Sequence, residues 1–175
     1  MRRLLKGILY LLVMMALLIV FLPKINLYYA AEKMMAKQNI YISDEKLKDK
    51  GISFHIENAS LLFEKLPLAQ VEEIRLKPWI LYSSIEIDTI CVNDGFADFL
   101  PSEIDIIEVK YWIFNPLYLK LSGQSKESLF YGEVDLLKRI VRIHLRLDAA
   151  SEKQYKSMLS KLTPEEGGYL YEYQF

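Results

Sequence analysis

The side chains that could do acid–base or metal chemistry are few in this sequence. Its two histidines, His55 and His144, each lie on the polar side of an alternating run, without an Asp, Glu or Cys at a convincing ligand spacing. We interpret both as solvated strand residues. Glu103, Asp105 and Glu108 of "SEIDIIE" have no catalytic partner in view, so we expect surface or turn positions. Without a nucleophile elbow or a phosphate-binding loop, the sequence predicts a non-catalytic protein that holds no metal or cofactor.

Cysteine content and charge narrow the function class further. Cys91 is the single cysteine, which excludes an intramolecular disulfide and a thiolate metal cluster. It lies in the strand-like run "IEIDTICV", and we expect a small apolar core residue, with an intermolecular bridge as the alternative. The formal net charge is −1, and the chain beyond its basic amino-terminal tail is mildly acidic. Nucleic acid is therefore not a predicted partner.

The amino terminus reads as a membrane anchor. Residues 4–22, "LLKGILYLLVMMALLIVFL", carry one charge, Lys6, near one end. At about 1.5 Å per residue they span roughly 28 Å, close to a hydrocarbon core of about 30 Å. A cleaved signal peptide is the alternative, but "FLPKINLYYAAEK" lacks small residues at both expected cleavage positions. We predict that residues 1–23 form a cytoplasmic tail and a single transmembrane anchor.

Basic residues on both sides of this segment bear on its orientation. They are Arg2, Arg3 and Lys6 before it and Lys24, Lys33 and Lys37 after it. The basic amino-terminal tail is short and directly adjacent to the span, which favours a cytoplasmic amino terminus. The rest of the chain is thus predicted to be exported.

The exported part is predicted to be mainly β. Residues 24–50 read as a short stem helix followed by a polar linker, and residues 51–175 as a β-rich domain. From residue 51 the hydrophobic period becomes two, with one apolar and one polar side in each run, which is typical of an antiparallel sheet. Residues 151–162 carry apolar residues at helical spacing. We expect a bent antiparallel sheet with one carboxy-terminal helix.

Two prolines interrupt the predicted strands. Pro78 and Pro116 each follow or precede an alternating run and lie close to an aromatic cluster. Proline cannot donate to a strand ladder, so we expect strand ends or bends at both positions. The neighbouring Trp79 and Trp112 suit either a core plug or an interfacial position.

The apolar side of the predicted sheet is the candidate functional surface. It must be covered by a second layer, by its own curl, or by a ligand. An uncovered part would form a groove for acyl chains or for a partner strand, while ordinary sheet-on-sheet packing is the alternative. The candidate residues are Val141, Ile143, Leu145, Leu117, Leu119 and Leu121.

The organisation also resembles a known family. A short tail, an anchor ending in "FLP", the segment "GISFHIENASLLF" (51–63) and the run "WIFNPLYLKLSGQSKESLFYGEVDLLKRIVRIHLRL" (112–147) are similar to the type II secretion system protein N family and related AsmA-like proteins. The ending "EEGGYLYEYQF" also looks like the last strand of that family.

This resemblance implies two functions. One is a non-catalytic, membrane-anchored component of a type II secretion, type IV pilus or DNA-uptake assembly that acts by protein–protein interaction. The alternative is an AsmA-like protein that binds or transfers phospholipid on an apolar sheet face. The location that the resemblance implies is the bacterial inner membrane, with a cytoplasmic amino terminus and the β-rich domain in the periplasm. The expected partners are the inner membrane, proteins of such a machine and phospholipid.

Overall fold

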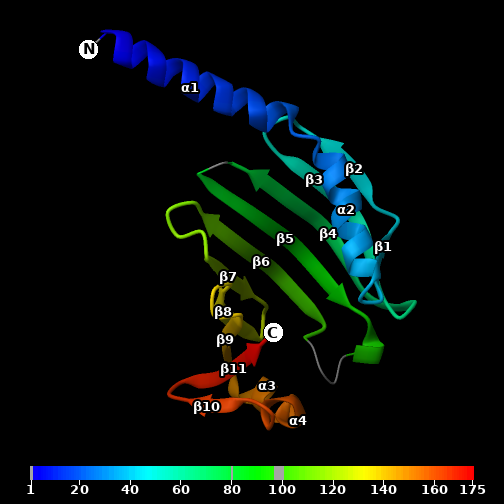
Figure 1. Cartoon of the computed structure of the whole chain (residues 1–175). Coiled ribbons are helices and arrows are strands. Elements are labelled where there is room, and N and C mark those ends of the chain that lie inside the picture. Colours follow the sequence, from blue (N-terminus) through cyan, green and yellow to red (C-terminus); the bar gives the residue numbers. More distant parts are fainter. Residues whose placement is uncertain (1, 80, 97–100) are drawn as a thin grey trace.

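The computed structural model describes residues 2–79, 81–96 and 101–175 and confirms a mainly β fold with an apolar amino-terminal helix (Figure 1). That helix, α1 (Arg2–Phe21), is long and apolar enough over Leu4–Phe21 to cross a membrane. Almost all of its described side chains are exposed. A helix without a polar face and without cover is typical of a membrane span.

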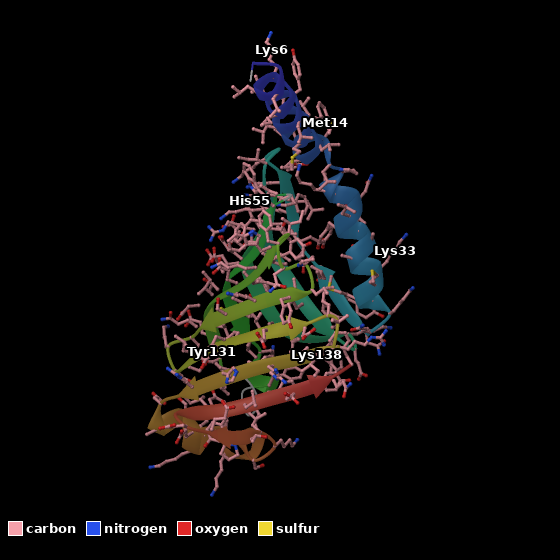
Figure 2. The ribbon with its side chains drawn as sticks, turned by 60° about the vertical axis from the view of Figure 1, so that its left-hand side comes forward. Lys6, Met14, Lys33, His55, Tyr131 and Lys138 are labelled. Atoms are coloured by element: carbon pink, nitrogen blue, oxygen red, sulfur yellow. The ribbon has the colours of Figure 1, made fainter. Side chains whose placement is uncertain are left out.

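Helix α2 (Lys24–Ala36) follows directly after Pro23, as predicted for a stem helix. It packs beside the first strands of the sheet, and Lys33 points away from them (Figure 2). The Lys24 ammonium donates to both carboxylate oxygens of Asp49 at 3.0 and 3.3 Å, and only 4% of the Lys24 side chain is exposed. This ion pair fixes the start of α2 against the end of β2.

The strands form one open, antiparallel sheet. In spatial order they run β1, β3, β4, β5, β6, β7, β8, β9, β11, β10, and β2 also pairs with β3. The strands are β1 (Ile40–Ser43), β2 (Lys46–Asp49), β3 (Phe54–Phe63), β4 (Leu66–Pro78), β5 (Tyr82–Val92), β6 (Glu103–Trp112), β7 (Tyr118–Gln124), β8 (Ser128–Asp135), β9 (Ile140–Leu147), β10 (Thr163–Glu165) and β11 (Gly168–Gln174). Consecutive strands are neighbours almost throughout, so the topology is a long meander.

Two segments differ from the sequence-based expectation. The predicted linker contains β1 and β2, which both pair with β3 through short antiparallel ladders. The predicted helix over 151–162 is present as two short pieces, α3 (Ala149–Gln154) and α4 (Lys156–Leu159), that meet at Tyr155. Asp148 caps α3 by accepting a hydrogen bond from the Ser151 N–H at 2.8 Å.

The two faces of the sheet differ in chemistry. We call the face that carries Phe54 and Ile56 the inner face, because α2 packs on it through Tyr28. The opposite, outer face carries His55 and Arg75. Residues paired across antiparallel strands share a face, so the register assigns each strand residue to one side.

The well-buried core lies at the α2 end of the inner face. Its buried members are Tyr28, Phe54, Ile56, Ala59, Ala69, Val71 and Ile90. They come from α2 and from β3, β4 and β5, so this core occupies only part of the sheet.

A break in the pleat crosses four strands at the same level. The runs "IENA", "VEEI", "IDTI" and "IDII" each hold two inner-face apolar residues three positions apart, where a regular strand would place them two apart. Asn58 and Thr89 adopt positive φ angles of 55° and 45° at this level. Because all four strands carry the same two-residue spacer, the register on either side stays matched. Such irregularities bend a sheet.

Candidate functional site

The apolar inner face continues across the sheet well beyond the core. Register places three rows of side chains on it from β5 to β11. The first row is Ile85, Val109, Leu121, Gly132, Ile143 and Tyr171; the second is Ile87, Ile107, Gly123, Phe130, Leu145 and Tyr169; the third is Tyr111, Leu119, Val134, Val141 and Tyr173. These rows form one apolar surface that crosses β5 to β9 and reaches β11.

This surface is not covered as a core would be. Among the described residues of β6 to β9 and β11, no apolar side chain reaches full burial, whereas β3, β4 and β5 contribute six. At its two margins, Ile85 is 38% and Tyr173 53% exposed. Neighbouring side chains shield one another, but no second sheet packs on this face in the described chain. The inner face is therefore an open apolar surface, which we call the groove.

Five of the six predicted groove residues lie on this surface. Leu119 and Leu121 of β7 and Val141, Ile143 and Leu145 of β9 occupy the rows given above. Leu117 lies outside them, in the turn before β7, where it is 42% exposed. It extends the alternation in sequence, but its carbonyl accepts the Leu136 N–H at 2.9 Å as part of a turn contact.

The aromatic members of the groove are absent from the sequence-based prediction. Phe130 covers Gly123 across the β7–β8 pair, and a Cβ at position 123 would overlap its ring. Tyr169, Tyr171 and Tyr173 line the β11 side, and the rings of Tyr171 and Tyr173 stack at 6.5 Å between centroids. Their two-residue spacing in "YLYEY" was the available signal.

Helices α3 and α4 close the groove at one end. Tyr155 and Leu159 are buried there, and the Tyr155 hydroxyl donates to Glu127 at 3.3 Å. Burial raises the pKa of Tyr155, and the nearby Glu127 carboxylate raises it further. A small pocket of about 190 Å³ remains under the helices. It is lined by Pro101, Ile104, Ser128, Phe130, Leu145, Leu147, Tyr155 and Met158.

The other end of the groove meets two turns rich in exposed aromatic residues. Pro78 ends β4 and Pro116 lies in the turn after β6, which confirms the predicted corners. Trp79 and Trp112 beside them are both exposed, so neither is a core plug. Trp79 also lines a pocket of about 450 Å³ between α1 and the β4–β5 turn. Its other lining residues are Leu12, Met15, Ala16, Ile19, Lys77, Leu81 and Tyr82.

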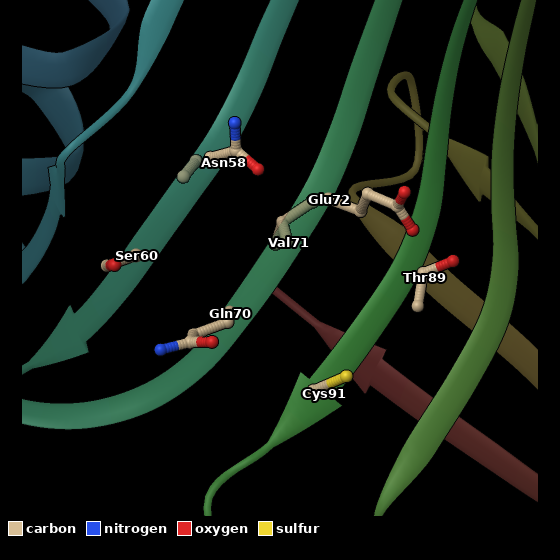
Figure 3. Close-up of a pocket in the computed structure, with 8 residues that line it drawn as sticks. Asn58, Ser60, Gln70, Val71, Glu72, Thr89 and Cys91 are labelled. Atoms are coloured by element: carbon tan, nitrogen blue, oxygen red, sulfur yellow. The ribbon is translucent and has the colours of Figure 1, made fainter.

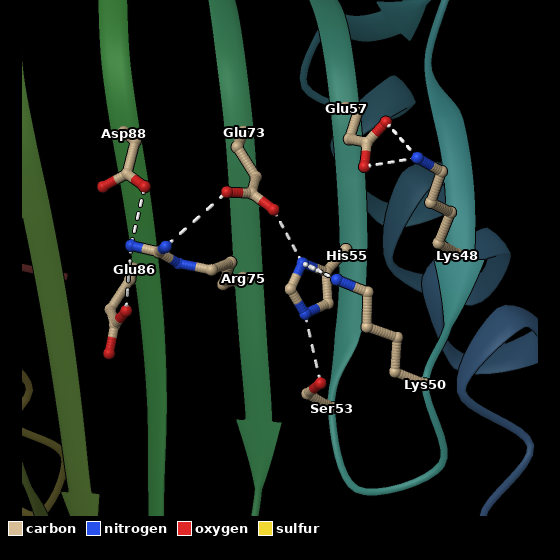
Figure 4. Close-up of polar contacts among 9 residues, drawn as sticks. All are labelled: Lys48, Lys50, Ser53, His55, Glu57, Glu73, Arg75, Glu86 and Asp88. Carbon is tan, nitrogen blue, oxygen red and sulfur yellow. Dashed lines mark hydrogen bonds and ion pairs between the residues drawn. The ribbon is translucent and has the colours of Figure 1, made fainter.

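The outer face is charged and internally paired (Figure 4). Arg75 bridges Glu73, Glu86 and Asp88 at 3.6, 3.2 and 2.6 Å. The hydrogen bond from Lys77 lowers the pKa of Glu86, and burial opposes this only in part. The prediction of a solvated His55 is wrong, because the ring is buried and its Nδ1 lies 2.6 Å from Glu73. A face of this kind is a solvated surface, which leaves the inner face as the candidate site.

The remaining chemistry-bearing residues also lie on the outer face. The prediction of a buried Cys91 is wrong, because its side chain is exposed beside a shallow polar pocket that also includes Gln70 and Thr89 (Figure 3). His144 stacks on Tyr131 with ring centroids 4.9 Å apart. In the described residues, no cluster of three His, Cys, Asp or Glu side chains is arranged to hold a metal ion.

The three predicted surface carboxylates, Glu103, Asp105 and Glu108, fall within β6 and not in a turn. Glu103 and Glu108 pair with lysines, Lys126 and Lys110, each at 2.6 Å.

No protein-family model matches the chain, and neither a curated protein nor a solved structure matches it.

Proposed function

We propose that this protein is anchored in a membrane by α1 and holds phospholipid acyl chains against the open inner face of its sheet. The observation that carries this proposal is the apolar surface from β5 to β11 without a covering layer in the described chain. Covering this surface with an apolar ligand is favourable, since each Å² of apolar surface removed from water contributes roughly 25 cal/mol of free energy.

The surface is wide enough for a lipid tail to lie along the strands. Neighbouring strands lie about 4.8 Å apart, so the five steps from β5 to β9 and on to β11 give roughly 24 Å of apolar width. The closed end under α3 and α4 and the exposed end near α1 give the groove a direction. In the proposed orientation the amino terminus is cytoplasmic and the sheet is periplasmic, so that the exposed end faces the inner membrane.

The test is lipid content. We would purify the full-length protein in mild detergent, exchange the detergent, and quantify bound phospholipid by mass spectrometry after extraction. Leu121→Gln places an amide in the centre of the groove and should lower the bound phospholipid severalfold. Ser122→Gln is the matched control, because the neighbouring residue lies on the outer face.

Thermal unfolding of both variants separates a lost ligand from a lost fold. The proposal fails if the wild-type protein carries no phospholipid, or if both variants carry as much as the wild type while remaining folded. A photoreactive phospholipid analogue provides an independent measurement, since its cross-links should fall on inner-face peptides of β6 to β9.

A second candidate is the protein-interaction role in a secretion, pilus or DNA-uptake assembly. The observation that favours it is the edge strand β1 (Ile40–Ser43), which contains no proline and pairs only with β3 in the described sheet. An edge of this type can accept a partner strand. Crosslinking in cells, followed by identification of the captured proteins, tests this role. Intact secretion, piliation and DNA uptake after deletion would count against it.

A further inference from the structure

The two turns at the exposed end of the groove form one continuous apolar surface, which we call the aromatic rim. It consists of Trp79, Leu81, Tyr82, Trp112, Ile113 and Phe114. The turns are joined, because Tyr82 pairs with Trp112 and the Ile113 N–H donates to the Leu81 carbonyl at 3.0 Å. Trp112 and Phe114 meet edge to face with centroids 6.2 Å apart. The rim is therefore one connected cluster and not a set of isolated exposed side chains.

The rim exposes large aromatic side chains to solvent, which is unfavourable in water. Trp79, Trp112 and Phe114 are 49, 57 and 79% exposed. Among the described residues at the opposite ends of the strands, the turns after β3 and β7 carry Glu64, Lys65 and Lys126. Phe63 and Leu66 are exposed apolar residues beside the first of these turns. These two turns have no joined aromatic cluster like that of the rim, which indicates that the rim meets an apolar partner.

The position of α1 identifies the partner. Trp79, Leu81 and Tyr82 share a pocket with Leu12 to Ile19 of the helix that is long and apolar enough to span a membrane. Figure 1 shows the β4–β5 and β6–β7 turns on the same side of the sheet as α1. At about 1.5 Å per residue, Ile19 and Leu12 lie roughly 3 and 14 Å from the end of α1 at Phe21. With α1 in a membrane, side chains beside Ile19 lie near the membrane–water interface, where tryptophan and tyrosine are enriched in membrane proteins, and those beside Leu12 lie deeper, among the acyl chains.

We propose that the aromatic rim inserts into the outer part of the leaflet next to α1, so that the open groove meets acyl chains directly at its mouth. The binding partner of the rim is thus the lipid bilayer itself. Tryptophan and tyrosine supply rings that tolerate the polar headgroup region, while Leu81, Ile113 and Phe114 supply the apolar contact below it. This inference rests on the membrane anchoring proposed above, but it does not require that the groove retain a lipid.

The tryptophans provide the test, because Trp79 and Trp112 are the only two in the sequence and both belong to the rim. We would reconstitute the full-length protein into vesicles of phosphatidylethanolamine and phosphatidylglycerol, with and without lipids brominated on their upper acyl carbons. We expect brominated lipids to remove about half or more of the emission, and aqueous iodide to remove little, as for interfacial tryptophans. Emission that iodide quenches freely and brominated lipids leave unchanged overturns the proposal.

Single variants assign the signal to each turn. Trp79→Phe leaves Trp112, which does not line the α1 pocket and is therefore the stricter reporter. The matched control is Phe63→Trp in a Trp79→Phe/Trp112→Phe background, which moves the only tryptophan to the opposite end of the sheet. There we expect the reverse pattern, with quenching by iodide and none by brominated lipid.

A further variant distinguishes quenching by the bilayer at the rim from quenching by a lipid bound in the groove. Leu121→Gln lowers lipid in the groove but leaves the rim unchanged, so quenching by brominated lipid should persist in this variant. Persistence supports membrane insertion of the rim even if the protein retains no lipid. Loss of quenching in Leu121→Gln alone shows that the signal came from a lipid in the groove and overturns the proposal.

Discussion

Phe130 lies directly over Gly123 across the β7–β8 pair, in the middle of the open groove. The glycine leaves the inner face without a side chain at this point, and the phenylalanine ring fills the place. The two residues therefore act as one unit that keeps the apolar surface continuous between Ile107 and Leu145.

We expect Gly123→Ala to destabilise the protein by about 1–3 kcal/mol, because the new Cβ would displace the Phe130 ring. The free energy of unfolding from denaturant titration of the full-length protein in detergent measures this. Gly95→Ala is the control, since only Asn93 Oδ1 at 3.5 Å lies near a Cβ there, and we expect a change within about 0.5 kcal/mol.

The double variant makes the test specific to the pair. In Gly123→Ala/Phe130→Ala the overlap is absent, so the two single costs should not add. Additive costs would show that the glycine matters for another reason.

Phe54 connects α2 to the sheet, because it is 2% exposed and its ring meets Tyr28 with centroids 6.1 Å apart. We expect Phe54→Ala to lower the free energy of unfolding by about 3–5 kcal/mol. Phe63→Ala, in the same strand but 40% exposed, should change it by less than about 1 kcal/mol. Similar losses in the two variants would contradict the placement of α2 on the inner face.

The ion pair between Lys24 and Asp49 predicts a pH dependence. Burial raises the pKa of Asp49, but hydrogen bonds from the Gly51 N–H and from Lys24 outweigh it and hold the pKa below its ordinary value of 3.8. A lowered carboxyl pKa in the folded state stabilises the protein above the unfolded-state value. That contribution is lost as the pH falls through the folded-state value.

Asp49→Asn should therefore lower stability at pH 7 by about 2 kcal/mol and flatten the loss of stability below pH 3.8. Denaturant titrations at pH 7 and at pH values below 3.8 measure the loss of stability and its dependence on pH. Lys48→Met removes an exposed ion pair with Glu57 and should leave the midpoint at pH 7 nearly unchanged. If the Asp49→Asn protein loses stability on acidification as steeply as the wild type, a group other than Asp49 is responsible for that loss.

Much of the fold could be predicted from the sequence, because alternation gives both strand and face for "IVRIHLRL" and "LYLKLSG". The break in the pleat could not be predicted this way, since it interrupts the period of two in each of β3 to β6. The signal was nevertheless present as four related runs, "IENA", "VEEI", "IDTI" and "IDII". Read strand by strand they look irregular, and only the register shows that the spacers are aligned.

Burial was the harder prediction, and Cys91 illustrates why. The run "IEIDTICV" suggests that cysteine follows isoleucine into the core, but Thr89 at positive φ lets Ile90 face inward and turns Cys91 outward. His55 shows the opposite error, because alternation places it on the polar face without revealing that Glu73 and Lys50 enclose it. Side-chain cover depends on neighbouring strands, which local sequence does not report.

The exposed position of Cys91 allows a direct test of both its placement and the proposed orientation. A thiol-reactive maleimide should label the folded, purified protein about as completely as the denatured protein, because the side chain is exposed. In cells with a permeabilised outer membrane, a membrane-impermeant maleimide should label Cys91 without lysis if the sheet is periplasmic. Since Cys91 is the only cysteine, no second site can contribute to the signal. Labelling that appears only after lysis would place the sheet in the cytoplasm, and labelling that appears only after denaturation would contradict the exposed position itself.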